Sequence, residues 1–167
     1  MKQLKASSGV FTIGSLLTLK EVLTITGQLV FSLNFFNNLK YIGFVSSFFK
    51  NHTVSILFKN WIIKLNRNFF SIFVYYIGNK FDKITSQIKE SSNDFFNHTD
   101  IDQLISRISK DKLDILVYLD ICMDPMTQIL ASLRLASIQC TTWGHPVTSG
   151  FKNIDYFYLA IHHRAKL

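Results

Sequence analysis

Three short stretches of the sequence contain side chains that could bind a polar substrate or move protons. The first, residues 46–52, reads SSFFKNH and ends in a histidine. The second holds Asp120 and Asp124, and the third, residues 144–150, reads GHPVTSG. Imidazole and carboxylate groups transfer protons, hydroxyl groups donate and accept hydrogen bonds, and glycines let a backbone approach a ligand closely. Each stretch is therefore a candidate for substrate binding or acid–base chemistry.

His52 comes at the expected start of a helix, directly after Asn51. If Asn51 caps that helix, the imidazole lies in the first turn, beside unpaired backbone N–H groups and the positive end of the helix dipole. There it could accept a proton as a neutral base or orient an anionic substrate. A histidine at a helix start is more often an ordinary surface residue, so both interpretations stay open.

The other two stretches are weaker signals of a functional site. Asp124 precedes Pro125, which favours the ordinary interpretation that Asp124 caps a helix and Asp120 is a polar loop residue. A carboxylate at this place could also bind hydroxyl groups or act as a base. The GHPVTSG loop has neither the glycine spacing of a dinucleotide fingerprint nor the GK[ST] ending of a P-loop.

The elements that must position these stretches alternate along the chain. Helical stripes of apolar residues and a helix after Asp124 separate short apolar runs that are typical of strands. The strands are expected at residues 41–45, 69–77, 113–119 and 137–143, and the stripes at 54–65, 84–88 and 101–108, the last capped by Thr99 or Asp100. This alternation implies parallel pairing with right-handed crossovers. We therefore expect an α/β, Rossmann-like parallel sheet whose strand ends carry the polar stretches.

Composition limits the class of protein. The 167 residues are 48% hydrophobic and include 16 Phe, which indicates one packed domain rather than a disordered chain. The net charge is +7, but the lysines and arginines are scattered singly, so we expect no nucleic-acid partner, although an anionic small ligand fits the charge. The apolar run 22–36 is too short and too polar to span a membrane, and no leader cleavage site is apparent. We expect a cytoplasmic protein.

No metal site is expected either. Cys122 and Cys140 lie far apart without paired spacing, and the pair His162–His163 has no third ligand nearby. The two cysteines are expected to be small residues of the core.

Two longer stretches together resemble one known family. KYIGFVSSFFKNHTVSILFKNWIIKLNR, residues 40–67, resembles the opening of the catalytic region of SPINDLY-type O-linked N-acetylglucosamine (O-GlcNAc) transferases. DILVYLDICMDPMTQILASLRLASIQCTTWGHPVTSGFKNIDYF, residues 114–157, resembles the later strand–helix–strand–loop of the same half. The two motifs occur in the family's order, and the resemblance extends over residues 40–157.

The resemblance implies a glycosyltransferase with two Rossmann-like halves facing across a cleft, the GT-B arrangement. The family transfers N-acetylglucosamine or a related sugar from a nucleotide diphosphate, here UDP, to a protein hydroxyl, with inversion and without a metal or other cofactor. His52 falls on the family's active-site histidine, and Asp111 is a weaker match to an acidic position. The matches to the loop that borders the cleft are Gly144, His145, Pro146 and Thr148.

The sequence also departs from the family pattern. Ser137 stands where the family usually has Pro, and Cys122 where it usually has Gly. The pattern stops after Phe157, and the second half, which supplies most of the uridine pocket and the basic residue facing the diphosphate, is missing. The expected organisation is an unassigned segment (1–38), a Rossmann-like N-terminal half (39–157) and an aberrant tail (158–167).

These observations favour a truncated or frameshifted relative of the family that is not active alone, because a cleft enzyme needs groups from both walls. Its expected partners are a nucleotide sugar, a protein acceptor and a separately encoded second half. Two alternatives stay open: a non-catalytic binding module or half of a split enzyme, and, less favoured, a basic nucleic-acid-binding α/β domain.

Overall fold

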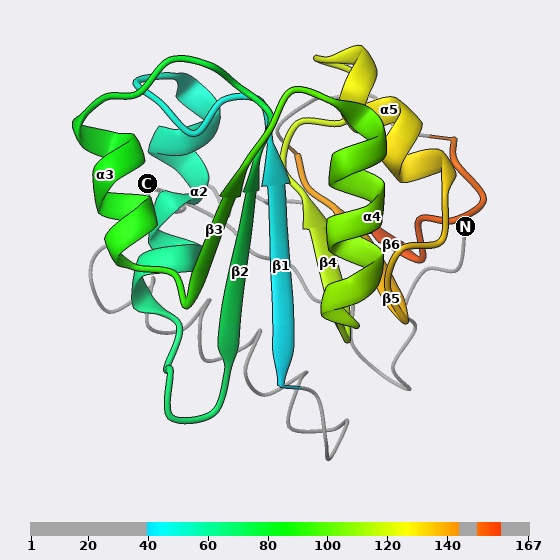
Figure 1. The fold of residues 1–167 in the computed structure, drawn as a ribbon, viewed down its shortest axis with the longest axis horizontal. Coiled ribbons are helices and arrows are strands. Elements are labelled where there is room, and N and C mark those ends of the chain that lie inside the picture. Colours follow the sequence, from blue (N-terminus) through cyan, green and yellow to red (C-terminus); the bar gives the residue numbers. More distant parts are fainter. Residues whose placement is uncertain (1–39, 144–149, 158–167) are drawn as a thin grey trace, which may run out of the picture.

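The computed structural model of the chain describes residues 40–143 and 150–157. These residues form one parallel sheet of six strands in the order β3-β2-β1-β4-β5-β6 (Figure 1). The strands are β1 (Tyr41–Ser46), β2 (Ser71–Tyr76), β3 (Asp94–Asn97), β4 (Ile115–Tyr118), β5 (Ile138–Thr141) and β6 (Tyr156–Phe157). The predicted α/β class with a parallel sheet is confirmed.

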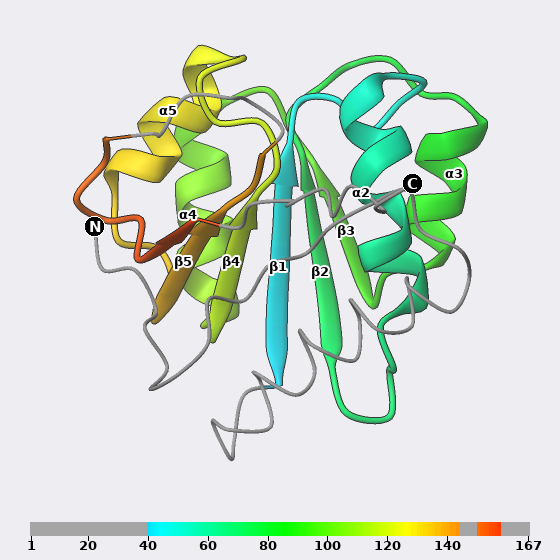
Figure 2. The same cartoon turned by 180° about the vertical axis from the view of Figure 1, so that it is seen from behind.

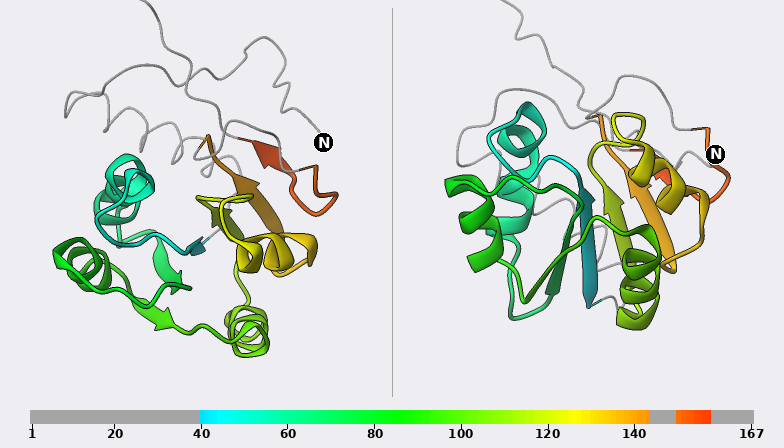
Figure 3. Two further views of the ribbon diagram at one scale, coloured as in Figure 1. Left: turned by 90° about the horizontal axis from the view of Figure 1, so that it is seen from above. Right: turned by 45° about the horizontal axis from the view of Figure 1, so that its top comes forward.

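Four helices connect the strands and cover both faces of the sheet. They are α2 (Thr53–Lys64), α3 (Lys83–Glu90), α4 (Ile101–Asp111) and α5 (Pro125–Ser132). Figure 3, seen from above, shows α2 and α3 on one side of the sheet and α4 and α5 on the other. None of the helices in the described part of the chain is long and apolar enough to cross a membrane.

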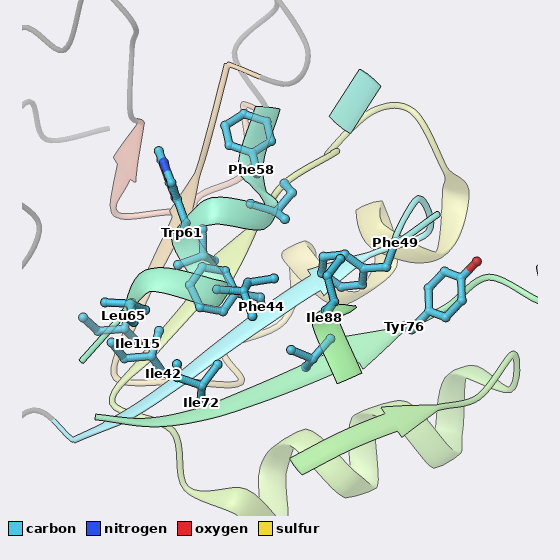
Figure 4. Packing of buried hydrophobic residues seen from close by; sticks show 14 of the residues in the cluster. Ile42, Phe44, Phe49, Phe58, Trp61, Leu65, Ile72, Tyr76, Ile88 and Ile115 are labelled. Atoms are coloured by element: carbon cyan, nitrogen blue, oxygen red, sulfur yellow. The ribbon is translucent and has the colours of Figure 1, made fainter. Parts of the chain in front are cut away.

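Two hydrophobic clusters fill the space between the sheet and the pair of helices on each of its faces, because alternate residues of each strand point to opposite faces. On β1, Ile42 and Phe44 face α2 and α3, whereas Val45 faces α4 and α5. Figure 4 shows the first cluster, in which Phe58 and Trp61 of α2 lie above the sheet. Burial on both faces explains why the strands read as continuous apolar runs rather than alternating ones.

All four predicted strands and the predicted helices are present, with strand boundaries that differ by one or two residues. The strand expected at 69–77 begins at Ser71, and Phe69 is exposed. Two strands were not predicted. β3 (DFFN) has only two apolar residues and is half-buried along its length, and β6 has only two residues. Both are outermost strands of the described sheet, where the hydrophobic signal is weakest.

The strand order creates a switch point between β1 and β4. The chain builds outward from β1 to β2 and β3, then crosses back through α4 to place β4 on the other side of β1 (Figure 2). At such a point the loops after the two neighbouring strands diverge, which leaves a crevice at their carboxyl ends. Here those loops are residues 46–52 and 119–124, which we call the carboxyl-edge site.

Candidate functional site

Asp120 lies fully buried at the switch point, two residues after the end of β4. Its Oδ2 accepts a hydrogen bond from the backbone N–H of Ser47, the residue after β1, at 3.0 Å. Neither Asp120 Oδ1 nor the Ser47 hydroxyl has a hydrogen-bond partner among the described residues. The sequence favoured an ordinary polar loop residue here, but the structure shows a carboxyl group that joins the two strand ends and keeps one oxygen unpaired.

The environment of Asp120 changes its acidity. Burial raises the pKa of this carboxyl to about 7, against the opposing effect of the Ser47 N–H bond. None of the ion pairs in the described ranges includes Asp120, so no cation offsets the burial. The group therefore titrates near neutral pH, where it can accept a hydrogen bond when ionised and donate one when protonated.

The loop after β1 is held in place by two serine hydroxyl groups, one from the end of β1 and one from α2. Ser46 Oγ accepts a hydrogen bond from the Phe48 backbone N–H at 2.9 Å. Ser55 in the first turn of α2 donates its hydroxyl hydrogen to the Phe48 carbonyl at 2.6 Å. Ser46 and Ser55 thus fix the backbone around Phe48, whose ring stacks on His52 with 4.2 Å between ring centroids.

His52 is the N-cap of α2, so the prediction that Asn51 caps this helix was wrong. The backbone of His52 is extended, and its Nδ1 accepts a hydrogen bond from the Val54 N–H at 3.3 Å. Asn51 does not cap α2, and its backbone N–H donates to Asp82 at 2.5 Å instead. Because the lone pair of Nδ1 serves the cap, the neutral ring carries its proton on Nε2. It then offers a hydrogen-bond donor, which suits an orienting role better than that of a base.

Lys50 adds a positive charge to the same loop. Its Nζ lies 5.7 Å from the centre of the Phe48 ring, on which His52 also stacks. An ammonium group and an imidazole N–H therefore lie close to one aromatic ring, an arrangement that favours an oxygen-rich or anionic ligand. Phe48 and Lys50 lie in the predicted stretch 46–52, but the spacing of residues does not show that Lys50 and His52 share the Phe48 ring as a neighbour.

Asp124 has the structural role that the sequence predicted. It is the N-cap of α5, and its Oδ1 accepts hydrogen bonds from the N–H groups of Met126 at 2.8 Å and Thr127 at 3.4 Å. Pro125 occupies the first turn, where it needs no hydrogen-bond donor. Its carboxylate is therefore engaged by the helix.

Asp111 lies away from His52, at the end of α4 that is next to the amino end of β4. Its carboxylate accepts hydrogen bonds from the Tyr75 hydroxyl at 2.7 Å and from Arg107 Nε at 2.9 Å. Arg107 also pairs with Asp94, and burial together with the Asp111 bond raises the pKa of Tyr75. We call these four residues the amino-edge cluster. The structure does not bring Asp111 together with His52, so a site role for Asp111 stays a prediction.

The remaining predicted site residues, Gly144, His145, Pro146 and Thr148, lie outside the described residues. The strand that leads to them ends at the carboxyl edge beside β4, where the Thr142 hydroxyl donates to the Leu119 carbonyl at 3.2 Å. Trp143, the last described residue before them, packs edge-on against Phe58 of α2 at 4.9 Å between centroids.

Two further observations concern cysteine chemistry and metals. Cys122 has a left-handed backbone with φ of 74°, a conformation that favours glycine, at the position where the family usually has Gly. Cys122 and Cys140 are not joined by a disulfide. In the described ranges, no group of three His, Cys, Asp or Glu residues is arranged to hold a metal ion.

The chain is similar to known proteins in sequence and in fold. A family model described as glycosyl transferase family 41 matches residues 17–161. A solved structure of a mutant O-GlcNAc transferase from Thermobaculum terrenum is similar to the chain, with a TM-score of 0.63 and 20% sequence identity over 72% of this chain and 24% of that one. At this identity the likeness shows the fold, and the chain spans about a quarter of the length of that transferase. No curated protein sequence matches the chain.

Proposed function

The chain belongs to glycosyl transferase family 41, and we propose that its carboxyl edge forms one wall of a site that transfers N-acetylglucosamine, or a related sugar, from a UDP donor to protein hydroxyl groups. The observation that carries this proposal is the hydrogen bond between Ser47 and Asp120 at the switch point of the sheet, at the start of the loop that ends in the helix cap His52. In open parallel sheets this is the place where ligands bind. A SPINDLY-like specificity and a cytoplasmic location are part of the same proposal.

Each group has a role that fits its environment. In the transfer, an acceptor hydroxyl oxygen bonds to the anomeric carbon, the bond to the diphosphate breaks, and the diphosphate leaves with the electron pair. The proton of the acceptor hydroxyl passes to water or to the departing diphosphate. His52, with its proton on Nε2, donates a hydrogen bond that orients a substrate oxygen. Asp120 fixes the end of β1 against the end of β4, and Lys50 attracts the negatively charged donor. The proposal needs no metal, as the resemblance implies.

The opposite wall of the cleft belongs to a second α/β unit in this proposal, which makes the described sheet the N-terminal half of a GT-B enzyme. That unit could be supplied by the same polypeptide or by a separately encoded one. Transition-state stabilisation needs preorganised groups on both sides of the substrate. We therefore expect the 167-residue chain alone to bind the donor weakly and to transfer little or no sugar.

Donor binding can be located by nuclear magnetic resonance on the isotope-labelled chain. Titration with UDP-N-acetylglucosamine to millimolar concentration should shift amide signals in residues 46–52 and 119–124 and leave the amino-edge cluster unchanged. His52→Ala should weaken these shifts. His98→Ala is a matched control, because His98 also follows a strand and its Nδ1 accepts an N–H bond two residues ahead, from Asp100 at 3.1 Å, but at the outermost strand. Shifts that are absent, or that map elsewhere, would overturn the proposal.

A transfer assay tests the need for a second half. The chain is incubated with radiolabelled UDP-N-acetylglucosamine and a peptide rich in serine and threonine, and the label in the peptide is counted. We expect none above background. Transfer that His52→Ala abolishes and His98→Ala preserves would support the sugar-transfer site but contradict the need for a second wall.

A further inference from the structure

The N-cap of α3 also holds the loop that carries His52. Asp82 Oδ1 accepts the N–H groups of Ile84 at 2.8 Å and Thr85 at 3.1 Å, which is the ordinary work of a capping residue. Its other oxygen, Oδ2, accepts the backbone N–H of Asn51 at 2.5 Å. Asn51 is 31 residues earlier in the chain and directly precedes His52. One carboxylate therefore joins the start of α3 to the start of α2.

Thr85 makes a second connection to the same loop. Its buried hydroxyl donates to the carbonyl of Phe49 at 2.6 Å and accepts the Asp82 backbone N–H at 3.1 Å, which completes the capping box. The two residues of the box thus bond to both sides of Lys50, at the Phe49 carbonyl and at the Asn51 N–H. A loop that is bonded at two backbone groups has few ways to move.

The other aspartate caps lack this connection. Asp100 and Asp124 each use Oδ1 for the first N–H groups of their own helices, and within the described ranges neither side chain bonds to another loop. Asp82 also differs in acidity. Although burial acts to raise the pKa of Asp82, the bonds from Asn51, Thr85 and Ile84 hold it below its ordinary value, so the ionised form makes these contacts.

We propose that Asp82 and Thr85 are positioning residues for His52. They fix the backbone on the N-terminal side of His52, so that its Nδ1 caps α2 and its Nε2 carries the proton of the neutral ring. Neither residue needs to touch the substrate. This positioning role serves sugar transfer and so rests on the proposed function. The contacts themselves can be measured without any sugar donor.

The decisive comparison uses two cap substitutions in the full chain. Asp82→Ser keeps an oxygen for capping α3 but removes the second oxygen that reaches Asn51, and Asp100→Ser is the same change at a cap without such a contact. Nitrogen chemical shifts of the imidazole report the tautomer of His52, and hydrogen exchange reports protection of the Asn51 and Val54 amides. We expect Asp82→Ser to mix the tautomers and to speed exchange at both amides about tenfold or more. Asp100→Ser should leave the tautomer unchanged and both rates within about twofold.

Thr85 supplies an independent test that does not alter the cap carboxylate. Thr85→Val removes the donor to the Phe49 carbonyl, whereas Thr85→Ser keeps it. Valine should shift the His52 ring signals and serine should restore them. If Asp82→Ser and Thr85→Val leave the His52 tautomer and the Val54 exchange unchanged while both proteins remain folded, the positioning role is wrong. A loosened His52 in a chain that binds no UDP-N-acetylglucosamine would support the positioning role and reject the proposed function.

Discussion

Two carboxylates at opposite edges of the same sheet have opposite surroundings. Asp111 in the amino-edge cluster accepts bonds from a tyrosine hydroxyl and an arginine, whereas Asp120 in the carboxyl-edge site has one oxygen without a partner and no ion pair among the described residues. A fully paired charge stabilises a fold, but a buried group with spare bonding capacity costs stability. The difference separates a group that serves the fold from one that is available for function, although both are acids close to a strand end.

The largest loss of stability is expected from removing the paired acid. Asp111→Ala leaves the buried Tyr75 hydroxyl and the Arg107 guanidinium without their shared partner. We expect a loss of about 3 kcal/mol in the free energy of unfolding, measured by urea denaturation. Donor-induced shifts at residues 46–52 should persist in the folded variant. Their loss there, without unfolding, would give Asp111 the site role that the sequence resemblance implied.

The unpaired acid should behave in the opposite way. When folding raises the pKa of a carboxyl group, its protonated form stabilises the fold. This stabilisation is fully present below the pKa of the unfolded state and is lost as the pH rises through about 7. Asp120→Asn keeps an acceptor for the Ser47 N–H and removes this titration. We expect the variant to gain about 4 kcal/mol relative to wild type between about pH 4 and about pH 8. Urea denaturation of both proteins across this range measures it, and parallel pH profiles would contradict the burial argument.

Gly43 on β1 reaches the amino-edge cluster from within the sheet. A Cβ at this position would lie 2.5 Å from Leu113 Cδ1, 2.9 Å from Leu116 Cδ1 and 3.1 Å from the Tyr75 ring. Gly43→Ala should therefore cost about 1.5 kcal/mol in unfolding free energy, because these buried side chains must shift. Tyr75 signals should move while those of residues 119–124 stay in place. Equal changes at both edges would show that the two regions are mechanically coupled.

The smallest effects concern backbone strain. Among the described residues, one non-glycine residue with positive φ lies next to Asp111 in the sequence and one lies two residues after Asp120. Cys122 and Lys112 both have positive φ, at 74° and 49°, and Lys112 is the left-handed C-cap of α4. Glycine should relieve either position and raise the unfolding free energy by about 0.5–1 kcal/mol. Only Cys122→Gly should alter the amide signals around Asp120. Met123→Gly, at a neighbour without positive φ, serves as a control and should lower stability.

The sequence predicted features that depend on local pattern. The α/β class, four strands and the cap Asp124 follow from periodicity and from the short polar side chains before each helix, and the same signal left Thr99 or Asp100 for the cap of α4, which is Asp100. The cap at His52 was missed because histidine is not among the preferred capping residues, and Asn51 beside it is. The meeting of Asp120 with Ser47 was missed for a different reason, since it depends on which strand lies next to β1. Strand order is a property of the whole chain that no local pattern contains.

That strand order also determines when the candidate site can form during folding. The hydrogen bond between Ser47 and Asp120 joins residues 73 positions apart, and it requires β4 to return beside β1 after β2 and β3 have been added on the other side. Closing so long a loop is entropically costly, and contacts of this kind slow folding. During synthesis, β1, α2 and β2 can associate while β4 is still inside the ribosome. We therefore expect the candidate site to be among the last parts of the sheet to assemble.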